Sequence, residues 1–187
     1  MRSYDVNSRT RPWTATSMLL APIDVPLSEL ARSVASVSPS LAEGLRNDRD
    51  GMLDVMLSER LQPEMGSERP LIVTGYPLRQ AALAKGSSAD PQTASRFELF
   101  YRGVELANGY DELLDPDELA RRSTENDRRR VATGRAALCA GGALIEAMRQ
   151  GLPPCAGVAV GVDRLQMVQS GRTDLQGCGF DGLHLTG

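Results

Sequence analysis

Two glutamates, Glu105 and Glu112, lie on either side of an Asn108-Gly109 pair and could reach one cleft if the chain turns there. Two carboxylates that approach one point repel each other unless a divalent cation or an ammonium group neutralises them. Magnesium is usually bound through one or two carboxylates and substrate phosphates. The alternative is that these are solvated acids near a helix N-terminus, where the helix dipole favours negative charge.

Some acids of this region fit the ligand role better and others fit the helix N-terminus better. Glu105 stands between the apolar Val104 and Leu106, which favours a ligand role. The acids that follow closely are better explained by the start of a helix; they are Asp115, Asp117 and Glu118.

A second group of residues could bind a flat or anionic ligand. In the segment "GVAVGVDRL", Gly157, Ala159 and Gly161 leave one face of an expected strand nearly free of side chains. Arg164 follows, and its guanidinium could reach back over that face to stack on a base or bind a phosphate. The alternative is that small residues permit close packing and that Arg164 pairs with a surface acid.

Composition excludes several classes of site. The net charge is −3 and aromatic residues make up 4%, which disfavours a non-specific nucleic-acid binder or a base-stacking platform. Three dispersed cysteines and a single histidine, His184, disfavour a zinc cage and a Ser-His or Cys-His nucleophile. We expect a cytoplasmic protein with reduced thiols, no signal peptide and no membrane span.

The elements that must position these residues follow from periodicity and turn residues. Residues 1–26 are expected to be irregular, and a helix is expected from the N-cap Ser28 to Ser38-Pro39. Further helices are expected over 50–61, from the N-cap Asp115 to Gly134, over 141–151, and from the cap Asp163 to Gly171. The arginine run 128–130 is interpreted as a solvated helix face in preference to an RNA-binding surface.

Strands are expected within 69–77, 95–103 and 104–109, the last two joined antiparallel by a turn at Gly103. A final strand over 157–162 is expected to pack through its valine face, formed by Val158, Val160 and Val162. These elements predict an α+β domain with an antiparallel sheet flanked by helices.

Two segments, in this order, resemble class II aminoacyl-tRNA synthetases of the lysyl branch. "RFELFYRGVELANGYDEL" is similar to the acidic strand-turn-strand element of that branch, and "GVAVGVDRL" is similar to its motif 3. The chain resembles more closely the elongation factor P lysine ligase family, a paralogue of lysyl-tRNA synthetase without the anticodon-binding domain. "YPLRQAALA", "GVELANGY" and Ala159 carry that closer resemblance, which extends over about residues 52–175.

The resemblance implies a role for each candidate residue. Glu105 would bind Mg2+ and ATP phosphates, Glu112 would hold that metal or the substrate ammonium, and Arg164 would grip ATP. The amino-acid substrate, lysine or β-lysine, would meet Asn108, Tyr110, Glu112 and Ala159, and the floor of the ATP pocket would be Gly157 and Gly161. The implied reaction forms an aminoacyl-adenylate from ATP and transfers the acyl group to a lysine of elongation factor P.

The motifs that this resemblance leads us to expect are not all present. We find neither motif 1, which forms the homodimer interface of the family, nor motif 2 with its arginine, so no catalytic residue is assigned. We therefore expect a divergent or irregular segment over 1–50, a partial catalytic domain over 51–176 and a divergent tail over 177–187. Two alternatives remain open, a lysyl-tRNA synthetase fragment acting on tRNA-Lys and a non-catalytic nucleotide-binding interaction module.

Overall fold

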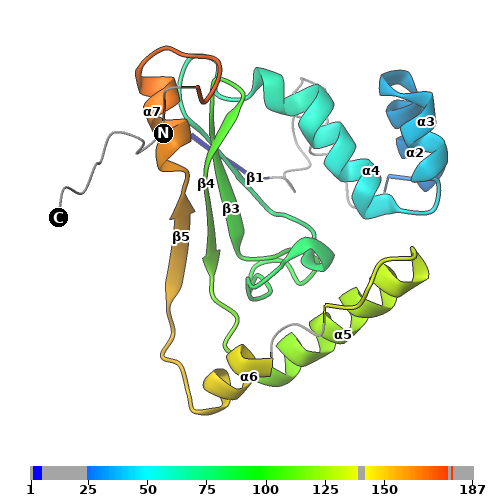
Figure 1. Cartoon of the computed structure of the whole chain (residues 1–187), viewed down its shortest axis with the longest axis vertical. Coiled ribbons are helices and arrows are strands. Elements are labelled where there is room, and N and C mark those ends of the chain that lie inside the picture. The colour runs from blue at the N-terminus through cyan, green and yellow to red at the C-terminus, as the bar shows by residue number, and fades with distance from the viewer. Residues whose placement is uncertain (1, 6–24, 139–141, 177, 179–187) are drawn as a thin grey trace.

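In the computed structural model, the chain folds into a twisted sheet with helices around it (Figure 1). The structure describes residues 2–5, 25–138, 142–176 and 178. The strands are β1 (Arg2–Asp5), β2 (Leu71–Thr74), β3 (Arg96–Tyr101), β4 (Val104–Asp111) and β5 (Ala156–Val160). The α-helices are α2 (Leu27–Val37), α3 (Pro39–Gly44), α4 (Arg49–Met56), α5 (Pro116–Ala132), α6 (Gly142–Arg149) and α7 (Val162–Gln169). Single turns form η1 (Leu57–Leu61), η2 (Gln62–Glu64) and η3 (Leu78–Gln80).

The sheet has the strand order β1-β2-β3-β4-β5. Neighbours from β2 to β5 are antiparallel, whereas β1 pairs parallel with β2. The predicted α+β class with an antiparallel sheet is therefore confirmed, with one parallel strand added. The expectation that residues 1–26 are irregular is wrong for β1, because four residues there pair with β2; residues 6–24 lie outside the described part of the chain.

The hairpin between β3 and β4 is fixed by its two turn residues. Arg102 and Gly103 have φ angles of 51° and 75°, the positive values that a two-residue type I′ turn requires. The predicted turn at Gly103 is thus confirmed, but the turn expected at Asn108-Gly109 is wrong, because β4 continues through both residues. A Cβ at Gly109 would lie 2.4 Å from Cε1 of Phe97, so glycine serves close approach there and not a turn.

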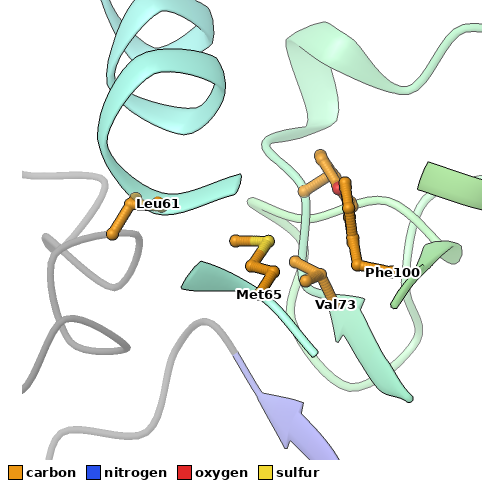
Figure 2. Packing of buried hydrophobic residues seen from close by; sticks show 5 residues of the cluster. Leu61, Met65, Val73 and Phe100 are labelled. Atoms are coloured by element: carbon orange, nitrogen blue, oxygen red, sulfur yellow. The ribbon is translucent and has the colours of Figure 1, made fainter. Parts of the chain in front are cut away.

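One apolar cluster joins the sheet to the segment after α4. It contains Leu61, Met65, Val73, Tyr76 and Phe100, each less than 8% exposed (Figure 2). The chain passes from α4 through η1 and η2 without a break, which confirms the helix expected over 50–61 and places its end over β2 and β3. This packing buries one face of β3, the face that also carries Glu98.

A second cluster holds α2, α3 and α4 together at the end of the molecule away from β5 (Figure 1). Pro26, and not the predicted Ser28, occupies the N-cap position of α2. Ser38 ends that helix as expected, and its hydroxyl also accepts a hydrogen bond from the Leu41 amide at the start of α3.

Helix α5 starts and stops as predicted. The Asp115 carboxylate accepts hydrogen bonds from the amides of Asp117 and Glu118, Pro116 occupies the first turn, and Gly134 follows the helix with a φ of 74°. No helix in the described part of the chain is both long and apolar enough to span a membrane.

The valine face of β5 does not pack as predicted. Val158 and Val160 are 57% and 50% exposed, because no described element covers this face of the edge strand β5. Val162 is also exposed, but it belongs to α7 and not to the strand. Helix α7 begins directly after the strand with Gly161 as its N-cap, so the predicted cap at Asp163 is wrong and that acid lies in the first helical turn.

Candidate functional site

The pairing register brings the predicted residues of β4 and β5 to one face of the sheet. Asn108 pairs with Glu98 on one side and with Ala159 on the other, and Tyr110 pairs in the same way with Gly157. Side chains of directly paired residues point to the same side of a sheet, and so do those of alternate residues along a strand. Asn108 and Tyr110 therefore stand beside a strand whose side chains on this face are absent or a single methyl group.

Glu112 extends this face just beyond the end of β4. Its amide donates to the Cys155 carbonyl over 3.0 Å, which ties it to the residue before β5. A Cβ built at Gly157 would lie 2.7 Å from the Glu112 Oε1 atom. The carboxylate thus lies over the bare part of β5, and glycine at position 157 makes room for it.

Glu105 and Arg164 meet at the opposite end of β4. The Arg164 Nη1 donates to the Glu105 carbonyl over 3.0 Å and lies 3.5 Å from its Oε2. A Cβ at Gly161 would lie 3.2 Å from the Arg164 Cδ, so the small residue leaves room for the arginine stem. The structure therefore brings Arg164 back to the sheet, and here it pairs with one of the two glutamates that sequence spacing singled out.

Sequence reasoning assigned no role to Glu98, which the structure places at the centre of this face. Glu98 is 6% exposed, Tyr76 donates to its Oε2 over 2.6 Å, and Arg96 pairs with its Oε1. The Arg96 guanidinium also lies 4.4 Å from the centroid of the Tyr76 ring. A buried carboxylate needs such partners. One sign of this burial in the sequence is that Glu98 lies on the same strand face as the apolar Phe100.

The environment of Tyr76 favours the protonated form of its hydroxyl. Burial is the main cause that raises the pKa of its hydroxyl far above the usual value, and the nearby charges of Glu98 and Glu105 raise it further. Tyr76 consequently remains a protonated donor to Glu98, and Glu105 lies near enough for its charge to act on the same hydroxyl.

One acceptor on this face has no partner among the residues that the structure describes. The Asn108 Oδ1 atom is buried and receives no hydrogen bond from the described residues. Leaving a buried acceptor unpaired costs about 1–3 kcal/mol, so it suits a position where a bound molecule supplies the donor. An ammonium group would satisfy this oxygen.

The donor set on this face suits Mg2+ better than a transition metal. It offers carboxylate oxygens from Glu98, Glu105 and Glu112. The described residues contain no group of three or more acids, cysteines or histidines close enough to form a metal cage. Mg2+ bound through one or two carboxylates and substrate phosphates needs no such cage.

The other charged groups singled out from sequence lie elsewhere. Asp115 caps α5 and Glu118 pairs with arginines of the same helix. In the arginine run, Arg128 contacts Glu125 and is 75% exposed, and Arg129 contacts Glu125 and Asp50. None of these side chains contacts Asn108 or Glu112 in the interactions of the described residues.

Comparison with known proteins gives an independent view of the chain. A family model described as "tRNA synthetases class II (D, K and N)" matches residues 39–177. Proteins named "Elongation factor P--(R)-beta-lysine ligase" are similar to the chain. The one from Salmonella gallinarum and the one from Photorhabdus laumondii are each 38% identical over 154 residues, which is 82% of this chain and 47% of the relative. That from Salmonella arizonae is 36% identical over 150 residues, 80% of this chain and 46% of the relative. The chain spans about half the length of the curated relatives it matches.

Proposed function

Because this chain belongs to the class II tRNA synthetases of the D, K and N group, we propose that it forms the amino-acid and ATP side of a cytoplasmic ligase. The ligase activates lysine or β-lysine and transfers it to a lysine of elongation factor P. The similarity to proteins named as elongation factor P β-lysine ligases supports this acceptor.

The observation that carries the proposal is the unpaired Asn108 oxygen next to a carboxylate and a bare strand. Asn108 Oδ1 and Glu112 would receive the ammonium group, and Tyr110 would wall the aliphatic stem. Ala159 stands directly opposite Asn108 and would limit the depth of the pocket by one methyl group.

The reaction would proceed in two steps, adenylate formation and acyl transfer. A carboxylate oxygen of the amino acid attacks the α-phosphorus of ATP, the bond to the bridging oxygen breaks, and pyrophosphate leaves. The neutral amine of the acceptor lysine then attacks the acyl carbon of the adenylate, so that an amide forms, AMP leaves and one proton is released. The contribution of the protein would be orientation and charge neutralisation.

We propose that Glu105 and Glu112, which lie at opposite ends of β4, each contribute to Mg2+ binding along the triphosphate, and that the buried Glu98 on the same face is a further oxygen donor. The ion would supply neutralisation of the triphosphate charge. Arg164 lies 48% exposed beside Glu105 and would release that carboxylate on binding the triphosphate.

We propose that the 187-residue chain needs a complementary polypeptide for the chemical step. The resemblance to class II enzymes implies an arginine on the α-phosphate from motif 2, which is not found in this sequence. On the described face of the sheet, Arg96 is engaged by Glu98 and Arg164 by Glu105.

The test is ATP–pyrophosphate exchange with lysine and with (R)-β-lysine. We expect little exchange by the chain alone and exchange that depends on one of these amino acids once a polypeptide carrying motifs 1 and 2 of a relative is added. No exchange in the complemented mixture would contradict the proposal. N108A, which removes the unpaired oxygen, should reduce exchange at subsaturating amino acid.

The acceptor is tested separately. Labelled amino acid should pass to elongation factor P and not to tRNA-Lys. Transfer to tRNA would instead identify the chain as part of a lysyl-tRNA synthetase, and binding of Mg-ATP without exchange would identify a nucleotide-binding interaction module.

A further inference from the structure

A short segment outside the sheet, residues 81–86, supports the end of β4. The Lys85 amide donates to the Asp111 carbonyl over 2.9 Å, and the Leu113 amide donates to the Leu83 carbonyl over 2.8 Å. Ala84 pairs antiparallel with Glu112 between these two bonds. The main chain that carries Glu112 is thus held by this segment on one side and by Cys155 on the other.

The same segment also packs against Tyr110, the proposed aromatic wall of the amino-acid site. Ala81 and Ala84 are 1% and 0% exposed and belong to a small apolar cluster against which Tyr110 packs. Between them, Ala82 has a φ of 51°, a left-handed conformation that costs an alanine about 1 kcal/mol or more. A conformation of this kind persists only where the surrounding structure imposes it.

Arg122 of α5 makes the contact that imposes it. Its Nη1 donates to the Ala82 carbonyl over 3.0 Å and to the Ala84 carbonyl over 2.7 Å. Its Nε donates to the Glu118 Oε1 over 2.7 Å, and the side chain is 17% exposed. One planar guanidinium therefore joins a helix carboxylate to both carbonyls of the strained turn, which is geometry that a lysine ammonium does not reproduce.

Arg121 provides a natural comparison within the same helix turn. It also donates to Glu118, through Nε and Nη2 over 2.7 and 2.8 Å, but its side chain is 67% exposed. No interaction found among the described residues joins Arg121 to the segment 81–86. The two neighbours share charge, helix and carboxylate partner and differ in the contact to the turn.

From this geometry we infer that Arg122 is a positioning residue for the amine-binding end of the pocket. It fixes residues 81–86, which in turn hold Glu112 and Tyr110 at the orientation that receives the substrate. The inference deepens the proposed function and rests on it for the identity of the ligand, whereas the mechanical link from Arg122 to Glu112 does not depend on it.

The link is tested by amide hydrogen exchange in the 187-residue chain. R122M should speed exchange at Lys85 and Leu113 about tenfold or more, the factor that loss of a hydrogen bond from a charged donor implies, while amides in β3 keep their protection. R121M should leave both amides unchanged. Equal effects of R121M and R122M, or no effect of R122M, would overturn the inference.

Binding separates positioning from general loss of structure. R122M should weaken lysine or β-lysine binding about tenfold in calorimetry and leave the affinity for Mg-ATP within about twofold. R122K should keep part of the affinity that R122M loses. R121M should leave the affinity for the amino acid unchanged. Equal losses for both ligands would overturn the positioning role. If the wild-type chain binds no amino acid, the proposed function fails in this chain, and hydrogen exchange still decides the link.

A rescue experiment covers the case in which R122M folds poorly. Glycine adopts positive φ angles without the cost that alanine bears. A82G should therefore recover part of the protection at Lys85 and Leu113 when it is combined with R122M. No recovery of this protection by A82G would show that Arg122 does not act by holding the strained turn.

Discussion

Single glycines of β4 and β5 are selected by contact as much as by chemistry. Gly157 leaves space for the Glu112 carboxylate, and Gly109 leaves space for the Phe97 ring. The two glycines lie in neighbouring strands and both face close contacts, but the atoms they meet differ in how easily they can move. This difference separates a functional from a structural substitution.

G157A should affect ligand binding more than stability. The added Cβ would meet the free end of the Glu112 side chain at 2.7 Å, which can move aside. We expect a several-fold loss of affinity for lysine in calorimetry and a change in the free energy of unfolding within about 0.5 kcal/mol.

G109A is the matched control, because its Cβ would meet Phe97 ring atoms at 2.4 and 2.5 Å and the Gly157 carbonyl at 3.0 Å. We expect it to lower the free energy of unfolding by about 1–3 kcal/mol in urea titrations. If G157A destabilises the chain as much as G109A, then Glu112 does not lie freely over β5.

A second residue-scale prediction concerns pH. Hydrogen bonds from Arg121, and then from Arg122, lower the pKa of the Glu118 carboxyl to about 2 despite an opposing effect of burial. Because the folded pKa lies below the unfolded value of about 4.3, the stability from this group is complete above the unfolded pKa and is lost as pH falls towards the folded one.

E118Q should therefore be less stable than the wild type by on the order of 1 kcal/mol near neutral pH, and the difference should shrink between about pH 5 and pH 2. Urea titrations across that range measure it. E125Q removes a more exposed carboxylate of the same helix and should cost less. A difference between E118Q and wild type that is constant with pH would contradict the assignment.

At the scale of elements, β5 combines a site face with an uncovered apolar face. Its small residues lie beside Asn108 and Tyr110, while Val158 and Val160 stand exposed on the other side. Alternation along the strand was correct, but packing of the valines requires a covering layer that no described element supplies. Strand periodicity predicts which residues share a face and not what lies against that face.

V158T tests this exposure. Thr has nearly the shape of Val, so the substitution mainly places a hydroxyl where a methyl was. At a half-exposed edge position we expect a change in the free energy of unfolding within about 0.5 kcal/mol.

The same substitution at Val73, which is 5% exposed in the core cluster, should cost about 1–3 kcal/mol because the hydroxyl is buried without a partner. Urea titrations of V158T and V73T give the comparison. A cost for V158T equal to that for V73T would mean that the valine face is buried in solution.

At the scale of the whole molecule, the two larger apolar clusters of the described chain stabilise different parts of it. Leu61, Val73 and Phe100 belong to the cluster under the sheet, next to the buried Glu98. Met52 and Val34 belong to the cluster that joins α2 to α4 at the far end (Figure 1). The two are connected through α4 and η1, which continue from one cluster to the other.

M52A and F100A should accordingly differ in how far their effects spread. Both side chains are at most 1% exposed, and each truncation should cost about 2–5 kcal/mol where the chain unfolds as one unit. We expect M52A to speed amide exchange mainly in α2 and α3, and F100A to speed it also in β3 and β4. Identical exchange patterns for the two variants would show that the clusters unfold together.

The sequence by itself determined the local signals and their order. Asp115 and Pro116 start α5, Gly134 follows its end, and Arg102-Gly103 closes the β3–β4 hairpin, because caps and turns depend on a few adjacent residues. The family resemblance carried by the β4 and β5 segments was likewise present in the sequence, and the match over residues 39–177 agrees with it.

Only the tertiary structure decided which residues meet. Asn108-Gly109 has the composition of a turn, but pairing with β3 and β5 on both sides keeps it extended. Glu98 joins the site because Tyr76 and Arg96, separated from each other in sequence, meet it in space. Pairing register and burial are set by segments far apart along the chain, and for that reason local pattern predicts the elements while the fold assembles the site.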